Sequence, residues 1–154
     1  MIHIFKTLLL TLIFFTLTAC NMSGVKDEEI GDEKSNVDFI QLKQETDEAY
    51  VNDDLVTSEK GYEILVRETP TVAENWFRLG NIYVRTNRPA AAVNLYREAV
   101  IRDPKYSKAW YNLSIVQLKQ TAYSLTEMLN YTSSDDPLYD KAKKMLDDIQ
   151  NIIK

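Results

Sequence analysis

The sequence holds one histidine and one cysteine in 154 residues, and both, His3 and Cys20, lie near its N-terminus. Nucleophilic catalysis of the Ser–His–Asp or Cys–His kind needs an imidazole beside the nucleophile, and the body of the chain has none. Zinc sites built on His or Cys are excluded on the same ground. A single cysteine forms no disulfide within the chain. The fold must therefore be stabilised by packing alone.

Glycine is scarce too, because the four glycines stand singly and leave no Gly-rich loop that would cradle a phosphate. Acidic residues outnumber basic ones by 23 to 18, but no pair of acids stands in an apolar stretch that would tune it for acid–base work. The sequence therefore predicts a protein that is not an enzyme and that has no cofactor and no metal site.

The N-terminus carries an apolar run from Leu8 to Leu17, preceded by Lys6. The run has about the length of the apolar region of a secretory signal and is shorter than the roughly 20 apolar residues that cross a bilayer. It ends in Leu17-Thr18-Ala19-Cys20, which resembles the lipobox of bacterial lipoproteins. The resemblance implies a signal peptide over 1–19 and lipidation of Cys20 by a diacylglycerol. Labelling of the protein with palmitate would detect this lipid. An ordinary secretory signal with an incidental cysteine is the alternative.

This resemblance also implies a place in the cell. Two or more acyl chains anchor a protein stably, at ~0.8 kcal/mol for each buried methylene group. The body of the protein is therefore expected in the cell envelope, outside the cytoplasm, where nucleic acid is not a partner. Asn21 follows the cysteine where Asp favours retention in the inner membrane. We therefore expect the outer membrane, facing the periplasm, with the inner membrane still open.

Residues 20–36 are expected to form the lipidated cysteine and a flexible acidic tether. From Lys26 to Glu59 there are 12 acids and 3 bases. Anionic lipid head groups repel such a segment, which would hold the following domain away from the membrane. A linker that is merely soluble is the simpler reading.

One window of the sequence carries a repeat pattern. It resembles a tetratricopeptide repeat, a helix–turn–helix unit, in eight residues: Trp76, Leu79, Gly80, Tyr83, Ala92, Tyr96, Ala99 and Pro104. Glycine inside a helix costs ~1 kcal/mol against alanine, so Gly80 predicts the close approach of a neighbouring helix. Thr71 and Glu74 form a capping box that predicts a helix start near Val72. Asn87-Arg88-Pro89 predicts the turn between the two helices.

The flanking sequence predicts two worn copies of this unit. Trp110 follows Trp76 at an interval of one repeat, and Pro70 precedes Pro104 at the same interval. We expect a worn repeat over 37–70, the complete repeat over 71–104 and a degenerate repeat over 105–136. The returning helix of the degenerate repeat is expected at about 123–131, after an inner turn shortened by one residue. The predicted fold is an all-α, short right-handed α-solenoid of about three helix pairs in a domain over 37–154, with a C-terminal capping helix over 137–153.

That last helix has one apolar stripe at helical spacing, made of Leu138, Ala142, Met145, Leu146, Ile149, Ile152 and Ile153. Repeat arrays need a terminal helix to cover their last apolar face, and this is the favoured role. A helix that binds a partner is the alternative.

The resemblance also implies which positions face the concave groove. Carried onto this chain by their offset from the tryptophan, they are Glu74, Phe77, Arg78, Asn81, Val84, Arg85, Lys108, Tyr111, Asn112, Ile115, Leu118 and Lys119. The candidates for binding a partner are Phe77, Arg78, Asn81, Arg85, Lys108, Tyr111, Asn112 and Lys119. The amides suit a peptide backbone, the cations suit carboxylates, and the two aromatic side chains suit apolar anchoring.

From Lys60 to Lys119 there are 10 bases and 5 acids, which favours an acidic or C-terminal segment of a partner. The chaperone-binding carboxylate clamp of this superfamily has lysine where Phe77 stands, so chaperone recognition does not follow. The favoured function is a membrane-anchored adaptor in the assembly of an envelope machine. The architecture resembles small lipoproteins of tight-adherence (Flp) and type IV pilus or secretion systems.

Three alternatives stay open. One is an accessory lipoprotein of β-barrel assembly. The second is a cell-wall enzyme accessory, or a carboxylate-dependent cell-wall hydrolase that would use Glu74 and Asp103. The third is a structural lipoprotein without a specific partner.

Overall fold

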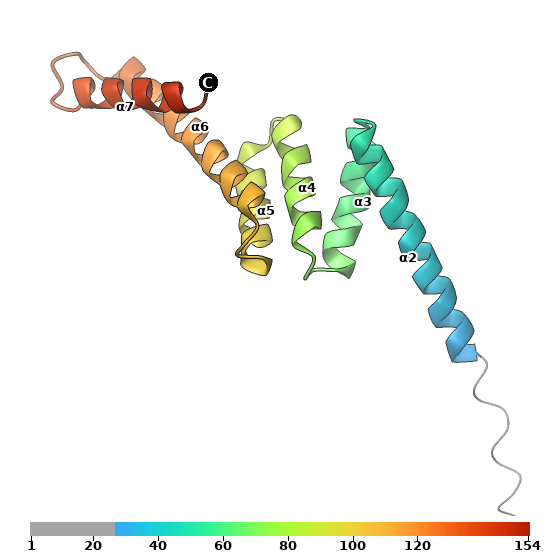
Figure 1. Cartoon of the computed structure of the whole chain (residues 1–154). Helices are drawn as coiled ribbons and strands as arrows, with labels where there is room; N and C mark the ends of the chain where they lie inside the picture. The colour runs from blue at the N-terminus through green and yellow to red at the C-terminus, as the bar shows by residue number, and fades with distance from the viewer. Residues whose placement is uncertain (1–26) are drawn as a thin grey trace, which may run out of the picture. The chain divides into compact units, whose positions relative to one another are not determined.

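The computed structural model describes residues 27–154, with side chains from residue 38 onward, and this part of the chain contains six α-helices and no strand. They are α2 (Asp27–Val51), α3 (Leu55–Glu68), α4 (Ala73–Arg85), α5 (Pro89–Arg102), α6 (Ser107–Tyr131) and α7 (Tyr139–Ile152) (Figure 1). The predicted all-α class is confirmed. The predicted signal peptide and Cys20 lie outside the described residues. No described helix is long and apolar enough to cross a membrane.

The chain divides into two compact units, Met1–Leu42 and Lys43–Lys154. In the first unit, the described residues belong to α2, which begins at Asp27. The expected flexible tether is therefore wrong for residues 27–36, which are helical. Three of these ten residues are glutamate, which has high intrinsic helix propensity, so the polar composition does not prevent a helix.

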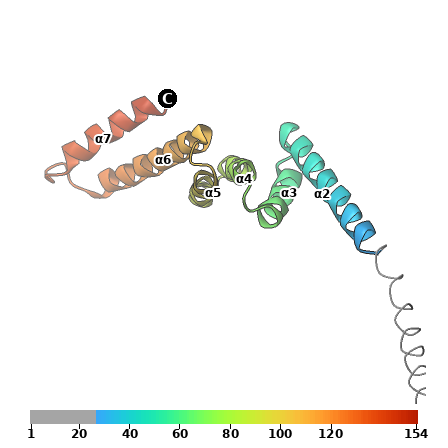
Figure 2. The same cartoon turned by 60° about the horizontal axis from the view of Figure 1, so that its bottom comes forward.

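In the second unit, each helix from α3 to α7 packs against the next one along the chain. Figures 1 and 2 show α3, α4 and α5 side by side, and α7 alongside α6. Neighbour-to-neighbour packing of this kind is the organisation of a helical solenoid, in which each repeat buries its apolar face against the adjacent one.

The complete repeat consists of α4 and α5. A Cβ atom on Gly80 would lie 2.7 Å from Cε1 of Tyr96, which confirms that a neighbouring helix approaches closely at this glycine. Ala92, Tyr96 and Ala99 face α4 and are at most 1% exposed. Asn87 has a positive φ of 60° in the turn, and Pro89 is the first residue of α5. The helix start and the turn therefore agree with the pattern.

The predicted capping box at the start of α4 is wrong. The N-cap residue is Val72, and no side chain caps this end. Glu74 instead accepts hydrogen bonds from Arg78, at 2.6 Å, and from the hydroxyl of Tyr106. Because both donors hold this carboxylate, it does not reach back to the N-cap backbone as a capping box requires.

The core of the second unit is built around α4, α5 and α6. Its buried members are Phe77, Ala92, Val93, Tyr96, Ala99, Val100, Ala109, Leu113 and Val116. Three partly buried aromatic side chains, Trp76, Tyr83 and Tyr106, pack against this cluster.

The worn repeat solves the close approach of its two helices in a different way. Thr46 of α2 stands at the position that Gly80 has in the complete repeat, so the small residue is missing from this helix. The glycine stands in α3 instead, where a Cβ atom on Gly61 would collide with Oγ1 of Thr46. The glycine therefore stands on the second helix of the worn repeat, where the complete repeat has it on the first. The two backbones remain close, but the sequence no longer matches the repeat pattern at this position.

The predicted degenerate repeat does not form two helices. The structure has one helix, α6, from Ser107 to Tyr131, where an inner turn and a returning helix at 123–131 were expected. No glycine or proline interrupts this stretch, so nothing in the sequence breaks the helix. The next helix is α7, and its Ala142 and Ile149 are buried.

Candidate functional site

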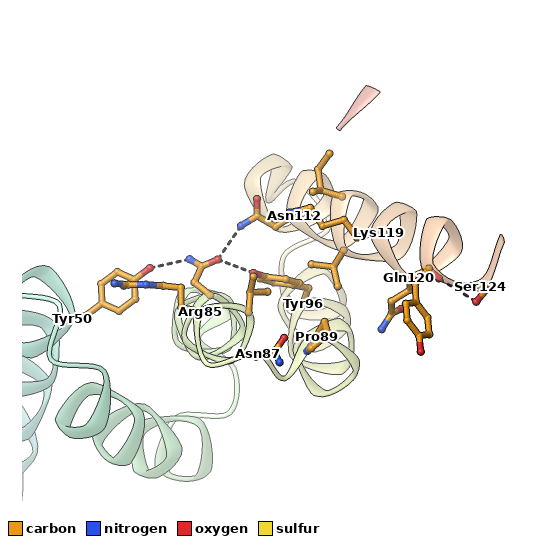
Figure 3. A pocket seen from close by; sticks show the side chains of 14 residues that line it. Tyr50, Arg85, Asn87, Pro89, Tyr96, Asn112, Lys119, Gln120 and Ser124 are labelled. Atoms are coloured by element: carbon orange, nitrogen blue, oxygen red, sulfur yellow. Dashed lines mark hydrogen bonds between the residues drawn. The ribbon is translucent and has the colours of Figure 1, made fainter. Parts of the chain in front are cut away.

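A cavity of about 950 Å³ lies within the second unit. Its walls come from the end of α2, from α4, from the start and middle of α5, and from α6 (Figure 3). The lining residues are Tyr50, Asn81, Val84, Arg85, Asn87, Pro89, Tyr96, Asn112, Ile115, Val116, Lys119, Gln120, Tyr123 and Ser124. The volume lies within the range of about 300–1,000 Å³ that ligand pockets occupy.

Asn81 is the centre of the hydrogen bonds at this cavity. Its Nδ2 donates to the hydroxyl of Tyr50 at 2.9 Å. Its Oδ1 accepts from the hydroxyl of Tyr96 at 2.8 Å and from Nδ2 of Asn112 at 2.9 Å (Figure 3). One amide therefore joins α2, α4, α5 and α6, and it fixes the spacing of the walls.

The same arrangement occurs one repeat earlier. Asp47 stands at the position of Asn81, and its Oδ1 accepts from the hydroxyl of Tyr62 at 2.6 Å and from Nη1 of Arg78 at 3.1 Å. Tyr62 and Arg78 in turn stand at the positions of Tyr96 and Asn112. An oxygen on the first helix, a tyrosine on the second and a donor on the next repeat thus form a repeated brace.

The two braces differ in charge. Burial raises the pKa of Tyr96 to about 12, which keeps its hydroxyl protonated and able to donate to Asn81. At the earlier brace, burial alone would raise the pKa of Asp47. Hydrogen bonds from Lys43 and Tyr62 and the charge of Arg78 outweigh it, so this pKa lies below its usual value of 3.8. The ionised brace at Asp47 is paired with Tyr62 and Arg78, and none of these three residues lines the cavity. The neutral brace at Asn81 lines the cavity.

The cavity has a positive balance. Two of its fourteen lining residues, Arg85 and Lys119, are cationic, and none is acidic. Arg85 forms an ion pair with Asp53, which is exposed and does not belong to the lining. Lys119 has no acidic partner among the described residues. The site therefore offers a cation with no internal counter-ion to an anionic group.

The remaining lining combines amides with apolar surface. Asn87, Asn112 and Gln120 supply further amide groups beside Asn81. The apolar part comes from Val84, Pro89, Ile115, Val116 and the rings of Tyr50, Tyr96 and Tyr123. Amides that pair with backbone groups, next to apolar surface and a cation, suit an extended peptide with an acidic group.

Four of the eight predicted partner-binding residues line this cavity: Asn81, Arg85, Asn112 and Lys119. Lys108 and Tyr111 are exposed on α6 but lie outside the lining. Arg78 is held by ion pairs with Glu74 and Asp47 and braces the helices.

Phe77 corrects the prediction of an apolar anchor. It is 9% exposed and belongs to the core, with its ring 4.9 Å from that of Tyr106 and 5.9 Å from that of Tyr96. Tyr106 and Tyr96 lie on the elements that pack over α4, so this ring is taken up by packing between repeats.

Several lining residues were not predicted from the sequence. Gln120, Tyr123 and Ser124 were placed at or beyond an expected turn, and the continuous α6 brings them to the cavity instead. The absence of glycine and proline from this stretch was the signal for a continuous helix. Tyr50 was not among the predicted residues, and the hydroxyl by which it accepts from Asn81 carried no sequence signal.

The proposed catalytic carboxylates are not arranged for acid–base chemistry. Burial alone would raise the pKa of Glu74, but hydrogen bonds from Tyr106 and Arg78 outweigh it and keep this pKa below its usual value. A general acid needs the opposite shift. The carboxylate of Asp103 accepts from the backbone N–H of Lys105 at 2.9 Å. The described residues also contain no group of three or more His, Cys, Asp or Glu that would hold a metal ion.

Paired helices that stack on their neighbours around a groove define a helical-repeat scaffold, a class that typically binds proteins and is not catalytic. Residues 73–116 match a family model described as tetratricopeptide repeat. The match covers α4, α5 and the first part of α6, and it supports a tetratricopeptide repeat protein, a class whose partners are typically proteins. No curated protein matches the sequence at a significant level.

Proposed function

We propose that this protein is an adaptor that binds an extended, acidic or C-terminal segment of another protein in the cavity between α4, α5 and α6. The observation that carries the proposal is the lining, which joins Lys119 and Arg85 to a row of amides and includes no acid. A carboxylate of the partner would pair with Lys119, and its backbone amides would pair with Asn112 and Gln120.

The proposal includes a place for this adaptor. Lipid on Cys20 holds the domain at a membrane of the cell envelope, and the outer membrane facing the periplasm is the favoured site. There the domain positions a component of a larger machine, such as a pilus or a secretion system. The lipobox Leu17-Thr18-Ala19-Cys20 and the non-catalytic repeat architecture support this part of the proposal.

The cavity is tested by fluorescence anisotropy with short fluorescein-labelled peptides. One peptide is rich in aspartate and has a free C-terminal carboxylate, and two matched peptides have asparagine for aspartate or a C-terminal amide. We expect the acidic peptide to bind and the matched peptides to bind more weakly. Lys119→Glu should weaken binding about tenfold or more, because a hydrogen bond to a charged group contributes about 1.5–3 kcal/mol.

The matched control is Lys143→Glu, which makes the same charge change on α7, outside the cavity lining. Equal loss of binding in both variants would show only a dependence on net charge and would contradict the cavity as the site. Circular dichroism of each variant checks that the helices remain.

The lipid anchor has its own test. Cells that express the protein are labelled with radioactive palmitate, and Cys20→Ser is expected to abolish the label. Label retained in this variant would contradict lipidation at Cys20 and leave the cavity proposal standing.

A further inference from the structure

Helix α7 and its N-cap residue carry a row of apolar side chains that remain exposed in the described part of the chain. Ala142 and Ile149, which are 4% and 7% exposed, are buried where α7 packs against α6. Beside them, Leu138, Met145 and Ile152 are 56%, 45% and 64% exposed. We call these three residues the α7 ridge. None of them lines the cavity, so the ridge is independent of the proposed peptide site.

The ridge has the spacing of a helix-packing seam. Its members are seven residues apart, and a straight α-helix drifts only ~20° for every seven residues, so they form one nearly straight row. Seams of this spacing occur where one helix packs along another. The α7 ridge is therefore shaped to receive a second helix.

The charges beside the ridge have a defined order. Lys141 precedes Met145 by four residues and Asp148 follows it by three. At ~100° for each residue, both lie within about 60° of Met145 on the side of the helix away from Ala142 and Ile149. Neither forms an ion pair with another described residue. The flank of the ridge is thus positive at its start and negative at its end.

We propose that the occupant of the α7 ridge is the α7 ridge of a second copy of this chain, in antiparallel orientation. Met145 packs against Met145 of the second copy, and Leu138 packs against its Ile152. Lys141 then lies opposite Asp148 of the second copy, and the symmetry repeats this contact at the other end. A parallel pairing places Lys141 level with Lys141 and Asp148 level with Asp148, which removes both attractions.

The size of the seam predicts weak association. Stable interfaces bury about 1,200–2,000 Å² in total, whereas each copy contributes three ridge side chains and their flanks. The dimer fraction should therefore rise with protein concentration, and the exchange of subunits between dimers should be fast.

The test uses disulfide cross-linking of the full chain, purified in detergent, with Cys20→Ser to remove the native thiol. Met145→Cys places a thiol at the centre of the seam. Lys143→Cys places one about 160° away around the helix and is the matched control. We expect a cross-linked dimer from Met145→Cys at least about fivefold above that from Lys143→Cys.

Charge exchange tests the orientation. In the Met145→Cys background, Lys141→Asp turns both attractive contacts into repulsive ones and should weaken association about tenfold. Adding Asp148→Lys should restore association to within about twofold. An equimolar mixture of the single variants Lys141→Asp and Asp148→Lys should also recover association, because each attractive contact is restored in the mixed dimer. The control Lys143→Asp makes the same change of charge away from the seam and should have no effect.

Equal cross-linking at residues 143 and 145 would overturn the proposal. Failure of the double exchange to restore association would overturn the antiparallel orientation and with it the proposal. A monomer at every concentration that binds phosphatidylglycerol vesicles, and loses this binding with Met145→Asp, would assign the ridge to a lipid surface instead.

Discussion

Replacement of Gly80 by alanine tests whether the tetratricopeptide pattern reports the packing of this chain. In an exposed helix this change stabilises by ~1 kcal/mol through helix propensity. Here the new Cβ atom would lie 2.7 and 2.8 Å from Cε1 and Cδ1 of Tyr96. The tyrosine ring is 1% exposed and its hydroxyl is bonded to Asn81, so it has no room to move away. Overpacking of this kind costs about 1–3 kcal/mol.

We therefore expect Gly80→Ala to lower the free energy of unfolding by up to about 2 kcal/mol, which is the overpacking cost of about 1–3 kcal/mol less the gain of ~1 kcal/mol in propensity. Urea denaturation followed by circular dichroism measures it. In a Tyr96→Leu background the clashing ring atoms are gone, and the same change should stabilise by ~1 kcal/mol. Ser114→Ala, one repeat later at an exposed position, is the control without a clash. If Gly80→Ala stabilised the unaltered chain, or if it still destabilised the chain in the Tyr96→Leu background, the close packing of Tyr96 on Gly80 would not explain its effect.

Three further predictions concern the contacts between repeats. The folded-state pKa values of Asp47 and Glu74 lie below their ordinary values of 3.8 and 4.5, so the stability that they contribute is present above about pH 5 and is lost as the pH falls through the folded values. The urea concentration at the unfolding midpoint should therefore decrease as the pH is lowered below about 4.5. This decrease should be less steep in Asp47→Asn. Arg88 pairs with the carboxylate of Glu59 at 2.8 Å, and its guanidinium lies 3.9 Å from the ring centroid of Tyr83. Arg88→Lys should therefore lower the free energy of unfolding, measured by urea denaturation, by about 1 kcal/mol. Tyr62→Phe should cost about 1–2 kcal/mol in the same assay, because it leaves two polar partners without its hydroxyl, whereas Tyr131→Phe, at an 86% exposed position, should change stability by less than about 0.5 kcal/mol.

The complete repeat was predictable because its key residues act locally. Gly80, Tyr96 and Pro89 each impose one requirement on the backbone or on the neighbouring helix, and the structure meets all three. The worn repeat was harder to read because the same close approach is built from Thr46 and Gly61, with the glycine on the other helix. A pattern tied to fixed positions does not register such an exchange.

The third unit differs from the prediction because one continuous helix stands where two were expected. An inner turn shortened by one residue was expected, yet the stretch from Ser107 to Tyr131 has no glycine or proline that would end a helix. Propensity decided the outcome, and α6 continues through the expected turn. This continuation brings Gln120 and Tyr123 to the cavity, so one error in the fold removed several residues from the predicted site.

Four of the eight residues predicted to bind a partner reach the cavity for a related reason. Asn81 and Asn112 reach the cavity because the repeat presents these positions inward, and the 2.9 Å bond between them confirms that they lie together. Position in the repeat did not predict the place of Phe77, which is buried in the core. A large apolar side chain is more stable in the core than in water, so this ring packs inward from the edge of the groove. Position in the repeat gives the direction of a side chain, and its neighbours decide its exposure.

Photo-cross-linking in cells tests the central claim, that the cavity holds a protein partner. A photoreactive amino acid replaces Ile115 inside the cavity, and in a second strain it replaces Lys143 on α7. We expect a discrete cross-linked protein from residue 115 that is absent from residue 143 and is lost when Lys119→Glu is added. No product from residue 115, or a product that survives Lys119→Glu, would contradict it.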